Sequence, residues 1–211
     1  MRRSAVTSTV PGELWRDATL VDHARDIAEK RLAALPARLA HVQAVATLGD
    51  RVARRLAPTA LYPIVAAAYL HDIGYSAELA HTGFHPVDGA VFARSEGFPE
   101  VVVGLVAYHS GAWSEAIERG LVEELQQFRI PPAPLLDILT YADLRTGPDG
   151  NLVSARARLA EVLDRYGPAE AVHRAVLRSR PALLTSVEQV AAALRALKDQ
   201  QPTEKQRRYT P

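Results

Sequence analysis

The stretch AAAYLHDIGYSAELAHTGFHP, residues 66–86, places a histidine and an aspartate side by side at the end of an apolar segment. The pair is His71-Asp72, and His81 and His85 follow within fourteen residues. The preceding letters, AAAYL, are typical of a buried helix. Polar side chains at the end of such a helix are costly unless they have partners, and these must come from elsewhere in the chain.

The composition limits what those partners can be. With 48% hydrophobic residues, the 211-residue chain can bury a substantial core, and we expect a single domain over residues 13–198. The formal net charge of +1 gives no global basic field for a nucleic-acid polymer. Because the chain has no cysteine, disulfides, zinc fingers and thiol catalysis are excluded, and any metal must be held by histidine, aspartate or glutamate.

We expect both ends of the chain, residues 1–12 and 199–211, to be flexible. The N-terminus contains no apolar stretch long enough for a signal peptide. The longest apolar run, Leu61 to Leu70, is interrupted by Pro63 and is shorter than the roughly 20 residues that a membrane span needs. These features predict a soluble, cytoplasmic protein that does not contact a membrane.

Apolar residues recur every three or four positions through most of the chain, and alternating strand patterns with hairpin turns are missing. This periodicity predicts an all-α fold. We expect helices at residues 13–34, 36–57, 60–72, 86–96, 99–109, 115–128, 133–145, 152–166, 168–179 and 182–198. Five helix starts are marked by prolines of the kind that a first turn tolerates, namely Pro36, Pro86, Pro99, Pro168 and Pro181. The segment RTGPDGN, residues 145–151, has the composition of a loop.

Several polar residues continue the apolar faces of these helices. His41 shares its face with Val45 and Val52, so it points toward the core. His109 and Asp143 extend the apolar stripes of helices 99–109 and 133–145 in the same way. The doublet His71-Asp72 closes a fourth helix, and all these side chains could therefore share one location.

A lone inward histidine is more often a core residue bonded to a backbone carbonyl than a metal ligand. Here two inward carboxylates, Asp72 and Asp143, accompany the histidines, and a buried carboxylate needs a counter-charge or a metal. Lysine does not supply that charge, because the chain has only three lysines and all lie outside the region: Lys30, Lys198 and Lys205. A divalent metal is therefore the predicted partner.

The order of these residues resembles the HD-domain superfamily of metal-dependent phosphohydrolases, in which a histidine, a His-Asp doublet and a distant aspartate follow one another. In this chain they are His41, His71-Asp72 within HDIG, and Asp143, and the resemblance spans residues 36–146. It implies an HD-type helical bundle with a hydrolytic metal site.

Dinuclear members of the family carry two further histidines between the doublet and the last aspartate. The segment HPVDGAVFARSEGFPEVVVGLVAYHSGA, residues 85–112, is similar to that insert and would supply His85 and His109. His81 is the rival of His85 for this place, although Gly83 disfavours one helix that presents both. The alternative interpretation of His81 is a side chain near the ligands or facing the substrate.

The resemblance implies two divalent ions, with iron or manganese as the first candidates and zinc, cobalt, nickel or magnesium as alternatives. Asp72 would bridge them, and the other predicted ligands divide into two sets: His41, His71 and Asp143 on one ion, and His85 and His109 on the other. A water held between two cations is acidic enough to attack phosphorus near neutral pH, so Asp72 is also expected to be catalytic. His81 and Ser110 could donate to the phosphoryl oxygens or to the leaving group.

One departure from the family bears on the substrate. Many members follow the doublet with a lysine, HDIGK, and this chain has Tyr75 there. The cations that remain nearby in the sequence are Arg51, Arg54 and Arg145. Arg145, which follows Asp143 closely, is the one that we expect at the substrate.

The predicted reaction is hydrolysis of a phosphate ester or anhydride, in a nucleotide or a small phosphorylated metabolite. One alternative is an HD-type di-iron oxygenase that cleaves a C–C or C–P bond, which the missing lysine keeps open. The other is a nucleotide-binding regulatory module without catalysis. The retained carboxylates argue against that module, because a chain without metal chemistry has little physical reason to bury them.

Overall fold

In the computed structural model, residues 17–199 are described, and they form an all-α bundle. The segments predicted to be flexible, 1–12 and 199–211, lie outside this range except for Asp199, which is the last residue of a helix. Within it there is no strand, and the nearest feature is an isolated antiparallel bridge between Thr146 and Leu152. No described helix is both long and apolar enough to cross a membrane.

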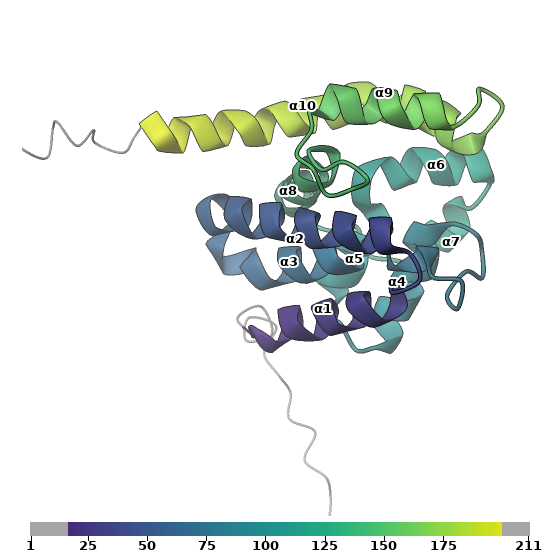
Figure 1. The fold of residues 1–211 in the computed structure, drawn as a ribbon, viewed down its shortest axis with the longest axis horizontal. Helices are drawn as coiled ribbons and strands as arrows, with labels where there is room; N and C mark the ends of the chain where they lie inside the picture. Colours follow the sequence, from purple (N-terminus) through teal and green to yellow (C-terminus); the bar gives the residue numbers. More distant parts are fainter. Residues whose placement is uncertain (1–16, 200–211) are drawn as a thin grey trace, which may run out of the picture.

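The first part of the bundle is built around one wholly apolar helix. Helix α3 (Leu61–Leu70) is buried on nearly all sides, as an all-round hydrophobic helix must be. It packs against α1 (Thr19–Arg31), α2 (Pro36–Leu56) and α5 (Glu100–Tyr108). Figure 1 shows α3 between α1 and α2. Because α3 is central, the residues at its C-terminal end are delivered into the interior.

The second part covers the opposite side. Helix α8 (Ala133–Leu144) packs on α2 and on the long C-terminal helix α10 (Ala171–Asp199), which also contacts α6 (Ala112–Arg119) and α9 (Ala155–Arg165). Helices α9 and α10 run along one edge of the molecule, away from α1 (Figure 1). The remaining helices are α4 (His85–Ser95) and α7 (Val122–Gln126), with three short 3₁₀ turns, η2 (Pro58–Ala60), η3 (Ile73–Tyr75) and η4 (His109–Gly111).

Most predicted helices are confirmed with shifted ends, but two predictions are wrong. The segment 115–128, predicted as one helix, is divided between α6 and α7 by Gly120, whose φ of 70° ends α6 in the left-handed conformation. The segments 168–179 and 182–198 are instead one helix, α10, with Pro181 inside it. Pro181 is exposed, so its ring faces solvent while the apolar face of the helix stays packed on both sides of it.

Candidate metal centre

Six polar side chains from five segments converge inside the bundle. They are His41 on α2, His71 and Asp72 at the end of α3, His85 at the start of α4, His109 at the end of α5 and Asp143 on α8. Five are nearly inaccessible to solvent, and the side chain of His85 is 14% exposed. The apolar helices that carry these residues account for their burial. The expected shared location therefore exists.

The first group comprises His41, His71 and Asp143, whose candidate ligand atoms all lie within 4.8 Å of one another. His41 Nε2 is 3.1 Å from Asp143 Oδ1, and His71 Nε2 is 3.9 Å from the same oxygen. Each residue therefore turns one nitrogen or oxygen toward a common point.

The second group comprises Asp72, His85 and His109, again within 4.8 Å. Asp72 Oδ1 lies 3.4 Å from His85 Nε2 and 3.8 Å from His109 Nε2. The two imidazole nitrogens are 3.2 Å apart. Such close approach of two nitrogens requires a shared proton or a cation between them.

Asp72 stands between the two groups. Its Oδ1 faces His85 and His109, whereas its Oδ2 lies 3.6 Å from His71 Nε2 and 3.9 Å from His41 Nε2. One carboxylate thus offers a separate oxygen to each set of histidines. This is the arrangement of a carboxylate that bridges two cations.

Backbone carbonyls orient three of the imidazoles. The Nδ1 atoms of His41, His71 and His109 lie 2.9, 2.8 and 2.6 Å from the carbonyl oxygens of Gly147, Ala68 and Val106, respectively. Since a carbonyl only accepts, each Nδ1 carries a proton. On the neutral ring of His71 the lone pair therefore lies on Nε2, toward the centre, whereas the Nε2 of His41 donates to Asp143 Oδ1 in the metal-free protein. The Nε2 of His71 is buried and has no hydrogen-bond partner among the described residues.

The donor set fits divalent metal ions. Imidazole nitrogen and carboxylate oxygen are ligands for iron, manganese, cobalt, nickel and zinc. The orphaned Nε2 of His71 is a buried lone pair that a cation would satisfy, and the buried carboxylates of Asp72 and Asp143 are anionic oxygens that can bind one. Each group could hold one ion, with Asp72 shared.

The comparison with protein families agrees with this geometry. The family model of the HD domain matches residues 38–169, more than half of the chain. The chain belongs to the HD family. No curated protein and no solved structure gives a significant match in the corresponding comparisons. The HD match extends past Asp143 through α9, beyond the segment 36–146 that carries the predicted motif.

The protonation states within the HD site suit metal binding. Burial lowers the pKa of His71 to about 4 and lowers that of His85 well below its usual value, so both rings are neutral at pH 7. For Asp143, burial favours the neutral acid, but the hydrogen bond to His41 and the nearby His71 outweigh it and lower the pKa. Burial acts on Asp72 in the same direction, and His71 and Arg38 outweigh it, so its pKa is also lowered.

His41 is the exception among the histidines. Burial favours its neutral form, but the hydrogen bond and the charge of Asp143 outweigh burial and raise its pKa. In the metal-free protein His41 therefore holds a proton more tightly than an ordinary histidine. Binding of a metal to its Nε2 must release that proton.

The glycine of HDIG has a packing role. A Cβ atom on Gly74 would lie 2.2 Å from the carbonyl oxygen of His85 and 2.8 Å from the backbone nitrogen of Gly89. Turn η3 and the start of α4 are therefore in direct backbone contact, and this contact brings His85 to the doublet. The loop before α4 is held by Asp88, which accepts hydrogen bonds from Thr82 and from Gly83 N.

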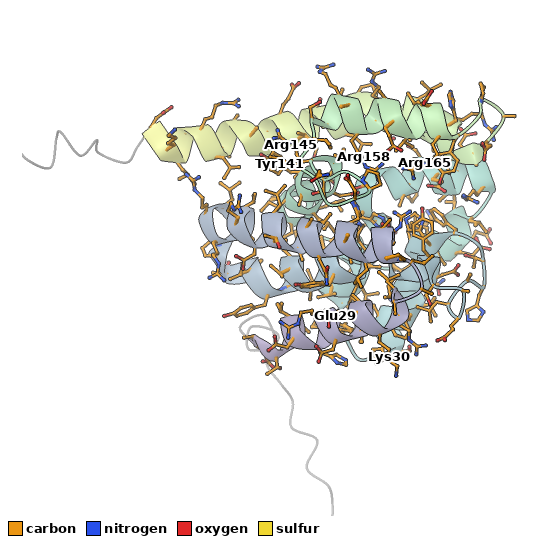
Figure 2. The ribbon with its side chains drawn as sticks, in the orientation of Figure 1. Glu29, Lys30, Tyr141, Arg145, Arg158 and Arg165 are labelled. Atoms are coloured by element: carbon orange, nitrogen blue, oxygen red, sulfur yellow. The ribbon has the colours of Figure 1, made fainter. Side chains whose placement is uncertain are left out.

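The structure places the three other predicted site residues differently. Ser110 donates a short hydrogen bond to Asp143 Oδ2, so it orients a predicted ligand. Arg145 lies at the start of the α8–α9 loop beside Tyr141 (Figure 2), with its guanidinium carbon 5.7 Å from the ring centroid. His81 is exposed and belongs to neither group of candidate ligands. Direct substrate contact by these three residues stays a prediction.

Sequence reasoning missed Arg38. Its Nη1 donates to Asp72 Oδ2 at 2.5 Å, and its guanidinium carbon lies 4.1 Å from the centroid of the Tyr75 ring. Arg38 precedes His41 by three positions, a spacing that puts both on one side of α2. That spacing could have placed Arg38 near the site, although it does not report the pairing with Asp72. Of the arginines considered instead, Arg54 pairs with Asp50 and Arg51 is exposed.

Proposed function

We propose that this HD protein is a metal-dependent phosphohydrolase with a dinuclear site, acting on a phosphate ester or anhydride of a nucleotide or small phosphorylated metabolite. The observation that carries the proposal is the position of Asp72, whose two oxygens face different pairs of histidines. A mononuclear site would need only one of those pairs.

In this proposal the ligands divide as the two groups do, with His41, His71 and Asp143 on one ion and His85 and His109 on the other. Asp72 contributes one oxygen to each. Two cations held there would acidify a water between them and neutralise charge on the phosphoryl group. Iron or manganese is the expected metal, because imidazole and carboxylate ligands together suit both.

The surrounding residues have supporting roles. The carbonyls of Gly147, Ala68 and Val106 hold three rings so that each Nε2 points inward. Ser110 holds the carboxylate of Asp143. Burial excludes bulk water from the ligands, so electrostatic interactions with a bound phosphate are stronger there than at an open surface.

The test is metal analysis joined to an activity screen. Protein purified without a chelating column should contain up to two divalent ions per chain by plasma mass spectrometry. The metal-loaded protein should hydrolyse at least one member of a panel of nucleotides and phosphomonoesters. His71→Ala and Asp72→Ala should lose metal and activity while keeping helical circular dichroism, and the exposed His23→Ala is the matched control.

A second candidate, a di-iron oxygenase, is favoured by one observation. Tyr75, at the place of the family's lysine, stacks on His85 with ring centroids 4.1 Å apart and an interplanar angle of 19°. Residue 75 therefore offers an aromatic ring, and no cation of its own, beside the candidate ligand His85. If the iron-loaded protein consumed oxygen and released no phosphate, the oxygenase would be supported and the hydrolase rejected.

The predicted cytoplasmic location belongs to the same proposal. It is supported by a sequence without cysteine, which suits a reducing compartment. Fractionation of cells that produce the protein tests it.

A further inference from the structure

The side chain of Arg38 connects three features next to the metal centre. It donates to Asp72 Oδ2 at 2.5 Å, its guanidinium carbon lies 4.1 Å from the centroid of the Tyr75 ring, and its side chain remains 23% exposed. Arg38 therefore reaches the interior carboxylate from a position that solvent, and hence a ligand, can also reach.

The guanidinium of Arg38 lies close to the position where the family motif HDIGK has its lysine. Tyr75 occupies the position at which HDIGK carries its lysine, so residue 75 itself provides no positive charge. The guanidinium of Arg38 lies against the ring of Tyr75, which in turn stacks on His85. A cation from α2 is thus held beside the position where the lysine would stand, and the aromatic ring keeps it there.

The guanidinium of Arg38 also has more N–H donors than its hydrogen bond to Asp72 uses. Arginine presents five N–H groups in a planar fork, and the hydrogen bond to Asp72 uses Nη1. This fork matches the oxygens of a phosphoryl group. The pairing with Asp72 balances charge in the metal-free protein, and cations at the Asp72 oxygens would remove the need for that pairing.

Beside Arg38 the surface is hollowed. A cavity of about 390 Å³ is lined by Ala34–Arg38 and Tyr75. A neighbouring cavity of about 350 Å³ shares Ala34, Leu35 and Tyr75 and extends toward Lys30, which lies at the end of α1 (Figure 2). Each is within the size range of small-molecule sites, about 300 to 1,000 Å³. Apart from Arg38, the first cavity is lined by apolar and aromatic side chains.

We propose that Arg38 binds the phosphoryl group of the substrate, and that the cavity between Leu35 and Tyr75 receives a compact apolar or aromatic part of the same molecule. The substrate class is thus an organic phosphate with a flat or apolar group close to the phosphorus, rather than an unsubstituted polyphosphate. This inference rests on the proposed function, because it assigns the binding of the phosphate to be cleaved.

The first experiment measures binding of inorganic phosphate to the manganese-loaded protein by calorimetry. Arg38→Gln should keep the wild-type metal content but bind phosphate roughly 10- to 100-fold more weakly, as expected for the loss of a charged hydrogen bond. Arg38→Lys, which keeps the charge without the fork, should fall between the two. Arg51→Gln, an exposed arginine on the same helix, is the matched control and should bind as the wild type does.

The second experiment tests the cavity with phenyl phosphate and methyl phosphate. The wild-type protein should bind phenyl phosphate more tightly, by about 10-fold, because the ring removes apolar surface from water. Leu35→Asn should reduce this preference without changing the affinity for inorganic phosphate.

Two results would overturn the inference: unchanged phosphate affinity in Arg38→Gln, or loss of metal from that variant to the extent seen in His71→Ala. Equal affinity of the wild type for the two esters would overturn the cavity assignment. Failure of the proposed function has a different signature. In that case the wild-type protein binds phosphate through Arg38 but hydrolyses none of the phosphate esters.

Discussion

Ser110 donates a hydrogen bond to the carboxylate of Asp143 from a backbone with φ of 41° and ψ of 45°. Among the described residues it is the only one other than glycine with a positive φ. A side chain in this region of backbone space costs about 1 kcal/mol or more, so the turn after His109 is held in place by its surroundings. Gly111, next in the chain, packs against Ser179 of α10.

This relationship predicts different outcomes for two substitutions. Ser110→Ala and Ser110→Gly both remove the hydrogen bond to Asp143, so both should weaken metal binding by roughly 10-fold, the usual effect of losing a partner of a ligand. Ser110→Gly should also relieve the backbone and be more stable than Ser110→Ala by about 1 kcal/mol. Metal titration and urea unfolding of the two variants measure these effects separately, and an equal stability would show that the turn is unstrained.

Gly74 provides the second prediction. Gly74→Ala would place a Cβ atom against the backbone of His85 and Gly89, so we expect a loss of about 3 kcal/mol in unfolding free energy. Because the start of α4 must move, metal content should fall as well. Gly49→Ala is the matched control: its nearest neighbour would be Ala68 Cβ at 3.8 Å, and alanine in a helix interior should be neutral or stabilising by up to about 1 kcal/mol. Equal behaviour of the two variants would contradict the packing role.

The buried histidines predict a pH dependence for the metal-free protein. The pKa of His71 is about 4 in the folded state, below the value near 6.5 of an exposed histidine. The unfolded chain therefore binds more protons between these values, so stability should fall as the pH decreases from about 6.5 to about 4, by about 3 kcal/mol from His71 alone. His85 acts in the same direction. His41, whose pKa is raised, acts in the opposite direction around and above pH 6.5, and its effect disappears at lower pH because both states then bind its proton.

Urea unfolding of chelator-treated protein at several pH values from 6.5 to 4.5 measures this slope. His23→Gln, which replaces a histidine with a half-exposed side chain, should leave the slope unchanged. A flat profile for the wild-type protein would mean that the doublet histidine is not held neutral.

Pro181 provides a prediction about α10 rather than the metal centre. A proline inside a helix removes one backbone hydrogen bond and crowds the preceding turn. Because Pro181 is exposed, Pro181→Ala should restore the bond without losing buried contacts and raise the unfolding free energy by about 1 to 2 kcal/mol. Pro134→Ala, in the first turn of α8 where proline is tolerated, should give no such gain. A loss of stability in Pro181→Ala would show that the proline shapes the packing of α10.

The helices and three of the six candidate ligands could be predicted from local spacing, the doublet His71-Asp72 could be read at the end of an apolar segment, and His85 was predicted only through the resemblance to dinuclear HD proteins. His41, His109 and Asp143 could be recognised since each continues an apolar stripe, and a stripe points toward the core wherever the helix lies. Pro36 marked a true helix start for the same local reason. These inferences needed no knowledge of which helix packs on which.

The missed features depend on contacts between distant segments. Arg38 meets Asp72 across 34 positions and Ser110 meets Asp143 across 33, and no local pattern reports either pairing. Pro181 was misread because packing of α10 on α6 and α8 outweighs the local preference for a break. The helix break at Gly120 was missed because the apolar residues continue past it with helical spacing, whereas the backbone leaves the helical conformation there.

The six converging side chains come from segments that lie far apart along the chain, from His41 on α2 to Asp143 on α8. Metal ions bound by these side chains would connect the helices that carry them. A helix of the set could separate from the bundle, and become accessible to a protease, only after its ligand had left the metal. The survival time of the polypeptide in a cell would then follow the supply of metal.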